Sequence, residues 1–212
     1  MHEAYLKKTF YFDFHSGEIE ELVGEIGSLP TEQERIEQLY LKVRDGWRYS
    51  PLVIGLTRSD YVASSIYQKP EAHCIDKAIL LIAGLRAVGV PARLHLAKVS
   101  NHIAAERLEK KLGTNELAPH GLVEVYHLGT WRKCSPAFNK ELCELYNVDE
   151  LEFDGTEDSV LQQYNRDHKK FMEYLDDYGH FEDVPLEQIK SIFRHNYPEL
   201  YEHFKQQESI NF

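Results

Sequence analysis

The stretch that decides the fold is residues 73–97, which read HCIDKAILLIAGLRAVGVPARLHLA. Over 74–88 this stretch is apolar on nearly every side, which predicts a helix buried at the centre of the molecule. Gly89 fits the position just after a helix, and Pro91 prevents the helix from continuing. Leucines then alternate with polar residues, which predicts a strand over 92–99 with one packed face.

Further strands are expected after this one. Residues 104–112 have the pattern of a short inserted helix, and the alternation over 122–128 predicts a second strand. A Gly-Thr turn separates it from a third strand over 131–134, and so short a turn favours antiparallel pairing. A buried helix followed by antiparallel strands that can pack on it predicts an α+β fold.

The segment before the buried helix carries two recognisable signals. Aromatic residues alternate over 5–15, which predicts an N-terminal strand. Thr31 and Glu34 form the Thr-x-x-Glu pattern of a capping box, and apolar residues at helical spacing follow it. We therefore expect a helix over 32–47 and a loop around a short helix over 50–70.

The last part of the chain is acidic and is expected to be helical. One helix is predicted over 160–175, and another is predicted to begin at Pro185. This part holds too little apolar surface to form its own core. We therefore divide the chain into a core domain over 1–150, with the N-terminal strand and helix, and an acidic helical extension over 151–212 that packs on it.

Composition limits the classes of partner and compartment. The 212 residues carry a formal net charge of −11, which repels nucleic acids and anionic membrane surfaces, so we expect neither as a partner. The first residues contain no apolar run of signal-peptide length. Three cysteines are too few and of the wrong parity for a disulfide framework, so a cytoplasmic location is expected; they are Cys74, Cys134 and Cys143.

Cys74 is the first candidate for chemistry because it opens the buried helix. The N–H groups and the dipole at a helix N-terminus favour a thiolate, so we expect a lowered thiol pKa. The alternative interpretation is a small buried apolar residue. His120 begins a strand expected to pack on this helix, where it could act as the general base for Cys74. A solvated loop histidine is the alternative for His120.

These segments resemble the transglutaminase-like domain family. Residues 73–97 resemble its central helix, which begins with the nucleophilic cysteine, and its first strand. Residues 120–136, HGLVEVYHLGTWRKCSP, resemble the following segment with its base histidine, and 40–49 resembles the preceding helix. The resemblance covers about 40–139. It implies a papain-like arrangement with a Cys–His–Asp triad and amide-bond chemistry through a thioester.

One departure from the family pattern concerns the third member of the triad. The family has an aspartate before the proline that follows the tryptophan, but Ser135 precedes Pro136 here. A serine hydroxyl can orient an imidazole without supplying negative charge. Asn139 is a second candidate for orienting His120, whereas Asp76 is a weaker one because it lies on the first turn of the cysteine's own helix.

We therefore expect a cysteine-dependent hydrolase or acyltransferase acting on a peptide or small amide, with Cys74, His120 and either Ser135 or Asn139 as its site. No cofactor and no metal are expected. Two alternatives stay open: a catalytically inactive binding module of the same fold, and a metal-dependent hydrolase using the scattered histidines. The sequence leaves the substrate and the oligomeric state undecided.

Overall fold

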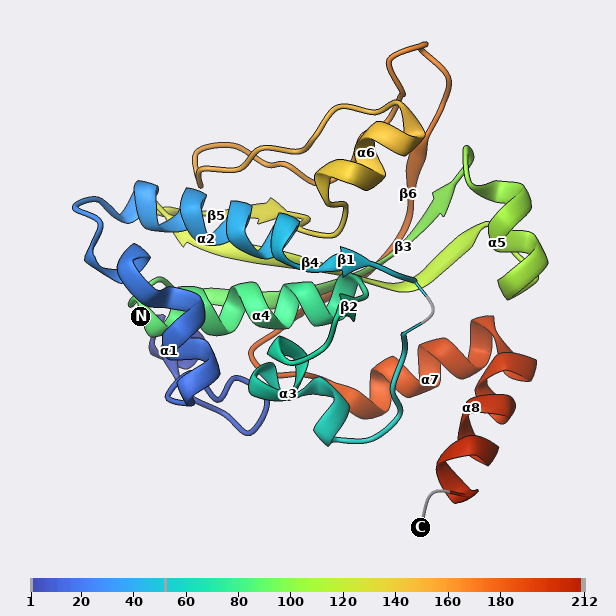
Figure 1. The fold of residues 1–212 in the computed structure, drawn as a ribbon, viewed down its shortest axis with the longest axis horizontal. Coiled ribbons are helices and arrows are strands. Elements are labelled where there is room, and N and C mark those ends of the chain that lie inside the picture. The colour runs from blue at the N-terminus through green and yellow to red at the C-terminus, as the bar shows by residue number, and fades with distance from the viewer. Residues whose placement is uncertain (1, 52, 211–212) are drawn as a thin grey trace.

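The computed structural model describes residues 2–51 and 53–210. Its central element is helix α4 (Cys74–Ala87), of which every residue except Ala87 is buried. The buried central helix predicted from the sequence is therefore confirmed. Three helices cover one side of α4 (Figure 1): α1 (Gly17–Val23), α2 (Glu32–Gly46) and α3 (Ala63–Tyr67).

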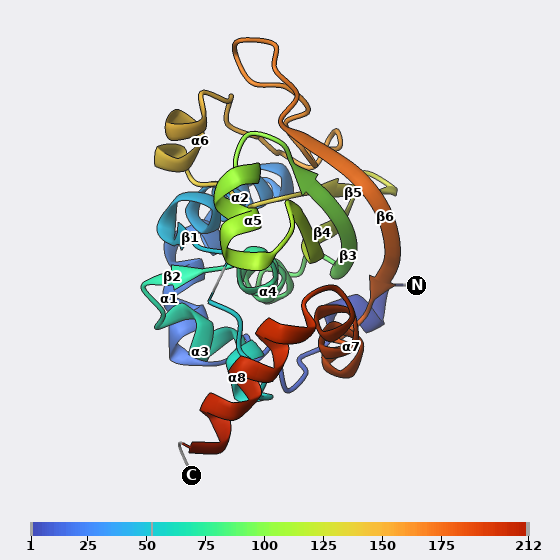
Figure 2. The same cartoon turned by 90° about the vertical axis from the view of Figure 1, so that its right-hand side faces the viewer.

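The other side of α4 packs against a four-stranded antiparallel sheet with the order β5-β4-β3-β6 (Figures 1 and 2). The first three strands were predicted, and Leu128 and Gly129 form the tight turn between β4 and β5 with positive φ angles of 49° and 85°. The architecture is the predicted α+β fold. The strands are β3 (Ala92–Asn101), β4 (Glu116–His127), β5 (Thr130–Cys134) and β6 (Met172–Phe181).

Shorter elements connect these layers. Strands β1 and β2 form a separate parallel pair at the end of α4 that carries Cys74, and α5 is the helix predicted between β3 and β4. The elements are η1 (Glu3–Leu6), η2 (Gly24–Ser28), η3 (Ser59–Tyr61), β1 (Arg48–Tyr49), β2 (Glu71–Ala72), α5 (Ala105–Leu112), α6 (Lys140–Tyr146), α7 (Leu186–Asn196) and α8 (Pro198–Ile210).

The end of α4 follows the local rules that the sequence indicated. Gly89 has a φ of 80°, a left-handed conformation that glycine adopts without strain. Its N–H donates to the Arg86 carbonyl at 3.1 Å, and the Val90 N–H donates to the Leu85 carbonyl at 2.9 Å. These two bonds form a Schellman motif, which ends the helix and turns the chain into β3.

The strand predicted over 5–15 was wrong. η1 occupies its beginning, and the remainder has no regular secondary structure. Phe12 is fully buried, with the Arg86 guanidinium 4.3 Å from its ring centroid, whereas Phe10 is 51% exposed. Both edges of β3 are already paired with β4 and β6. Tyr11 and Phe12 are both buried, so burial in this irregular segment does not follow the alternation of its aromatic residues.

The helix predicted over 160–175 was also wrong. Residues 160–171 contain no helix, and β6 begins at Met172 and pairs with β3. Half of the β6 residues are exposed and several are acidic, so this edge strand lacks the apolar alternation of a half-buried strand. Pairing with β3 stabilises this strand, which the local sequence pattern does not indicate. The helix predicted to begin at Pro185 is present as α7, and α8 follows it.

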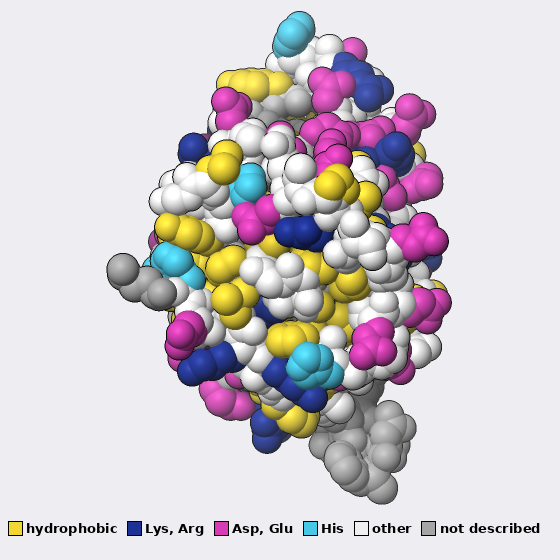
Figure 3. Space-filling view, turned by 90° about the vertical axis from the view of Figure 1, so that its left-hand side faces the viewer, with side chains coloured by type: hydrophobic (Ala, Val, Ile, Leu, Met, Phe, Trp, Pro, Cys, Tyr) yellow, Lys and Arg dark blue, Asp and Glu magenta, His cyan; other side chains and the backbone are white. Residues whose placement is uncertain are grey.

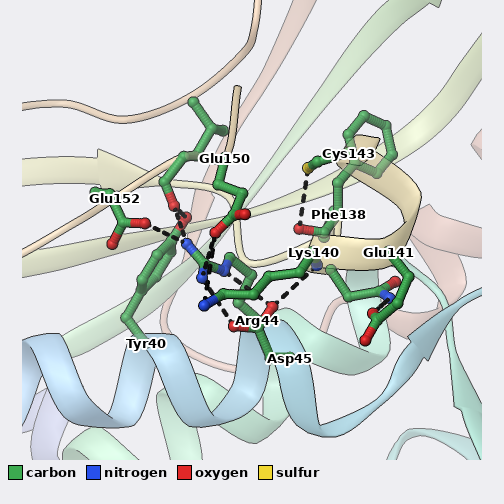
Figure 4. Close-up of polar contacts among 12 residues, drawn as sticks. Tyr40, Arg44, Asp45, Phe138, Lys140, Glu141, Cys143, Glu150 and Glu152 are labelled. Atoms are coloured by element: carbon green, nitrogen blue, oxygen red, sulfur yellow. Dashed lines mark hydrogen bonds and ion pairs between the residues drawn. The ribbon is translucent and has the colours of Figure 1, made fainter. Parts of the chain in front are cut away.

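Arg44 of α2 fixes the loop that follows α6 (Figure 4). The buried guanidinium donates to the Leu151 carbonyl and to Glu152, both at 2.8 Å, and forms ion pairs with Asp45 at 2.8 Å and Glu150 at 3.2 Å. Burial alone would lower the pKa of Arg44, but the hydrogen bonds to Asp45 and Glu152 raise it above its usual range. The guanidinium is therefore a fixed positive charge inside an acidic region.

The C-terminal helices lie beneath the end of α4 that carries Cys74 (Figure 2). Phe193 of α7 and Tyr197 form a second apolar cluster with Leu56, separate from the main core. The Tyr197 hydroxyl accepts the Ala118 N–H at 2.8 Å and donates to the Glu116 carbonyl at 2.7 Å. These contacts join α7 to β4 a few residues before His120.

Acidic side chains lie at the surface, as the net charge of −11 requires. Figure 3 shows the face at the other end of the molecule from Cys74, where acidic side chains gather along one flank and hydrophobic ones nearer the centre. In the described part of the chain, no helix has the length and apolar character needed to cross a bilayer.

Candidate active site

Cys74 is the first residue of α4, and the residue before it caps the helix. The His73 Nδ1 accepts the Asp76 N–H at 3.2 Å, while the Asp76 carboxylate accepts the His73 N–H at 3.4 Å. This reciprocal arrangement is a capping box built with histidine and aspartate. Lys69 Nζ lies 3.3 Å from both Asp76 oxygens, so the start of the helix is rigidly held.

Strand β4 comes into direct backbone contact with this first turn. A Cβ added to Gly121 would lie 2.7 Å from the Ile75 Cα and 2.9 Å from the Ile75 nitrogen. Only glycine permits this approach, because a side chain would collide with backbone that cannot move aside. The residue before it is His120, so the backbones of both predicted catalytic residues adjoin this contact between β4 and α4. The His120 side chain lines a different cavity from Cys74, and no hydrogen bond joins the two side chains.

The thiol of Cys74 is neutral in this environment. Burial raises its pKa to about 11, against the opposing effect of the N–H groups of Gly121 and Ile75. The side chain is 6% exposed. The prediction of a lowered pKa at the helix N-terminus was therefore wrong, because desolvation outweighs the dipole.

His120 is a buried, neutral imidazole. Burial, with a smaller effect from the neighbouring His73, lowers its pKa to about 4. The residue is 1% exposed, and neither ring nitrogen has a hydrogen-bond partner among the described residues. Such unpaired buried nitrogens are rare in folded proteins.

The two residues predicted to orient His120 differ in position. Ser135 lines the same internal cavity as His120, a space of about 10 Å³, but makes no hydrogen bond to the ring. Asn139 precedes α6, where its Oδ1 accepts the Tyr49 N–H at 3.0 Å and its Nδ2 donates to Glu141. The amide of Asn139 is thus engaged in joining β1 to α6 and not in orienting His120.

Cys74 opens into a small cavity of about 30 Å³, whose walls are mainly apolar. His73 also lines this cavity, and its Nε2 is buried without a hydrogen-bond partner. One wall comes from α7 through Ile189 and Phe193. Sequence reasoning missed this wall and the role of His73, although the His-x-x-Asp spacing of the capping box was a usable signal.

A larger cleft of about 620 Å³ lies beside the cavity and shares Tyr49 and Leu117 with it. Helices α5 and α6 and strands β1 and β2 supply its walls, which combine charged and apolar side chains. Arg48 and Glu71 form an ion pair on one wall. The cleft is large enough for a ligand of several residues and reaches the neighbourhood of the thiol.

Lys77 fixes α4 one turn beyond Cys74. Its fully buried Nζ donates to the Arg44 carbonyl at 2.7 Å and to the Ala137 carbonyl at 2.9 Å. Burial lowers the pKa of this amine to about 7. The residue therefore joins α4 to α2 and to the segment between Ser135 and Asn139.

The histidines considered as metal ligands have other partners. His95 Nδ1 lies 2.7 Å from Glu124 and His127 Nδ1 lies 2.6 Å from Glu32. Glu124 also accepts a hydrogen bond from the Arg93 Nε at 2.6 Å. Across the described residues, no three His, Cys, Asp or Glu side chains are grouped as a metal would require.

Comparison with known proteins agrees with this arrangement. Residues 20–136, more than half of the chain, match the transglutaminase-like superfamily. The chain belongs to the transglutaminase-like superfamily. The matched region includes α4 with Cys74 and β4 with His120, and it ends before β6 and α7. No curated protein matches the chain.

A solved structure shares the fold. It is described as a putative cysteine protease from Cytophaga hutchinsonii, and it is 17% identical with a TM-score of 0.51. The likeness covers 86% of this chain and 47% of that one, so this transglutaminase-like chain spans about half the length of its structural relative. At this identity the likeness concerns the fold, and it extends over most of the chain.

Proposed function

We propose that this protein is a cysteine-dependent hydrolase or acyltransferase that cleaves an amide or peptide bond through a thioester. The observation that carries the proposal is the backbone contact of Gly121 with Ile75, because Gly121 follows His120 and Ile75 follows Cys74 in the chain. Membership of the transglutaminase-like superfamily supports it. The adjacent cleft is large enough to hold a peptide.

In this mechanism the Cys74 sulfur attacks the substrate carbonyl carbon and its proton passes to His120. The new S–C bond gives a tetrahedral oxyanion, which the N–H groups at the start of α4 stabilise. The C–N bond then breaks, and the proton on His120 moves to the departing amine. Water, or a second amine, attacks the resulting thioester, and the thiol regains its proton as the acyl group leaves.

The two pKa values indicate how the proton moves. With the Cys74 pKa raised to about 11 and the His120 pKa lowered to about 4, the resting pair is a thiol and a neutral imidazole. A neutral imidazole is the form that can accept a proton. We therefore propose that proton transfer accompanies attack on the bound carbonyl, in place of a preformed thiolate–imidazolium pair.

The test is acylation by p-nitrophenyl acetate, followed as release of p-nitrophenolate and as a mass increase assigned to one cysteine. We expect a burst on Cys74, none in Cys74→Ala, and a burst rate at least tenfold lower in His120→Gln. Cys134→Ala and Cys143→Ala are the controls, because both residues are buried away from the cavity and should leave the burst intact.

A non-catalytic binding module is the second candidate, and the missing hydrogen-bond partner of His120 favours it. In that case Cys74 would form no acyl adduct, or would form one at the same rate in the His120→Gln variant. Either result would contradict the catalytic proposal. A folded, ligand-binding protein that forms no such adduct would support the binding module.

A further inference from the structure

The cavity at Cys74 has two features that identify it as a site for a ligand. The nucleophilic sulfur lines it, and so does His73, a side chain 3% exposed whose Nε2 has no hydrogen-bond partner. The unpaired His73 Nε2 indicates a ligand independently of the sulfur. An unpaired buried polar atom is costly unless a bound group satisfies it.

Most polar side chains of the remaining walls already have partners. The Tyr197 hydroxyl is bonded to two backbone groups of β4, and the Tyr61 hydroxyl donates to the Gly55 carbonyl at 3.0 Å. The Lys190 Nζ is 3.3 Å from Glu187. Apolar side chains supply the rest of the surface, among them Ile54, Leu117, Ile189 and Phe193.

One wall of the cavity lies outside the superfamily match. The match ends at residue 136, whereas Ile189, Phe193 and Tyr197 belong to α7 and its C-terminal end. β6 leads the chain back to the sheet, and α7 then packs beneath the start of α4 (Figure 2). The lining of the cavity is therefore set by this chain's C-terminal segment and not by the matched region alone.

We infer that this cavity is the acyl pocket of Cys74 and that α7 restricts it to short, apolar acyl groups. The inference rests on the proposed function and adds the substrate class. The cavity has a volume of about 30 Å³, and one water needs roughly 10–15 Å³. The cavity therefore holds about two or three methylene-sized groups. A charged or strongly polar acyl chain would lose its hydration and could gain at most the His73 Nε2 as a partner in a mainly apolar cavity.

The test compares p-nitrophenyl esters that differ in the acyl group, each rate being divided by the rate of the same ester with N-acetylcysteine. In each reaction the Sγ–C bond forms, the ester C–O bond breaks, and p-nitrophenolate leaves. We expect the normalised acylation rate of the butyrate ester to exceed that of the acetate ester by about fourfold for each buried methylene. Methoxyacetate, a polar isostere of butyrate, should be about tenfold slower than butyrate, and octanoate should be slower than butyrate.

Phe193→Ala provides the second arm, because it enlarges the pocket from the α7 side. We expect it to move the preferred ester from butyrate to hexanoate or octanoate. Phe204→Ala is the matched control, since Phe204 packs in the same apolar cluster but does not line the cavity, and it should keep the butyrate preference.

Two kinds of failure are distinguishable. If no ester acylates Cys74, the proposed function fails. If Cys74 is acylated but methoxyacetate reacts as fast as butyrate, or if Phe193→Ala keeps the wild-type order of esters, the acyl pocket is not this cavity and the inference alone is overturned.

Discussion

The Gly121 backbone touches the Ile75 backbone so closely that no side chain fits between them. This contact joins the strand that carries His120 to the helix that begins with Cys74. The relative position of the two residues therefore depends on a glycine that takes no part in the chemistry.

Replacement of Gly121 by alanine should push β4 away from α4. A Cβ would lie 2.7 Å from the Ile75 Cα, and such overpacking costs about 1–3 kcal/mol. We expect a lower urea midpoint and at least tenfold slower acylation of Cys74. Gly46→Ala is the control, since no atom lies within 4 Å of its added Cβ, and it should change neither quantity appreciably.

Tyr197→Phe should loosen the cover over Cys74. The change removes the two hydrogen bonds to Glu116 and Ala118 and leaves a buried N–H unpaired, at a cost of about 1–3 kcal/mol. Labelling of Cys74 by iodoacetamide at constant pH should become several times faster. Tyr201→Phe is the comparison, because Tyr201 meets Phe193 only through its ring; equal rates in both variants would refute the role of the Tyr197 hydroxyl.

Lys77→Met should have a pH-dependent effect on stability. The folded-state pKa of about 7 lies below the ordinary value of roughly 10.4, so the unfolded chain holds the proton more tightly. Wild-type stability should therefore rise between about pH 7 and pH 10 relative to Lys77→Met, by an amount on the order of a few kcal/mol.

Urea midpoints at about pH 6 and pH 9 measure this difference. Lys42→Met is the matched control, because the exposed Lys42 Nζ also donates to two backbone carbonyls, those of Glu21 and Leu22. The difference between wild type and Lys42→Met should be the same at both pH values. A constant difference for Lys77→Met as well would contradict the prediction.

His120 should make the protein sensitive to acid. Its folded-state pKa of about 4 lies below the ordinary value of roughly 6.5, so the unfolded chain binds the proton first as the pH falls. The stability lost between about pH 6.5 and pH 4 should be about 2–3 kcal/mol. His120→Gln should flatten this part of the urea-midpoint profile, whereas His15→Gln, at an exposed position, should not.

The parts of the fold that were predictable are those in which local sequence and tertiary packing agree. The uninterrupted apolar run of α4 predicts burial whatever its neighbours are, and Thr31 with Glu34 forms the expected capping box before α2. The β6 segment gives no such signal, because its register is supplied by β3 and its exposed face is polar.

The places of Cys74 at a helix start and of His120 on a strand were predictable, but the electrostatics around them were not. The helix start and the strand position identify Cys74 and His120, since both follow from local pattern. The raised pKa of Cys74 depends on burial in a cavity that α7 helps to close, and α7 lies far along the chain from Cys74. No local pattern around residue 74 contains that information.

The position of α7 in the chain also affects how the protein is made. Ribosomes release a chain from its N-terminus, so α4 and its thiol emerge long before Ile189, Phe193 and Tyr197. During that interval the nascent chain presents an uncovered sulfur beside an apolar hollow, and oxidants or chaperones can reach both. The α7 wall of the cavity is thus translated well after the nucleophile that it helps to cover.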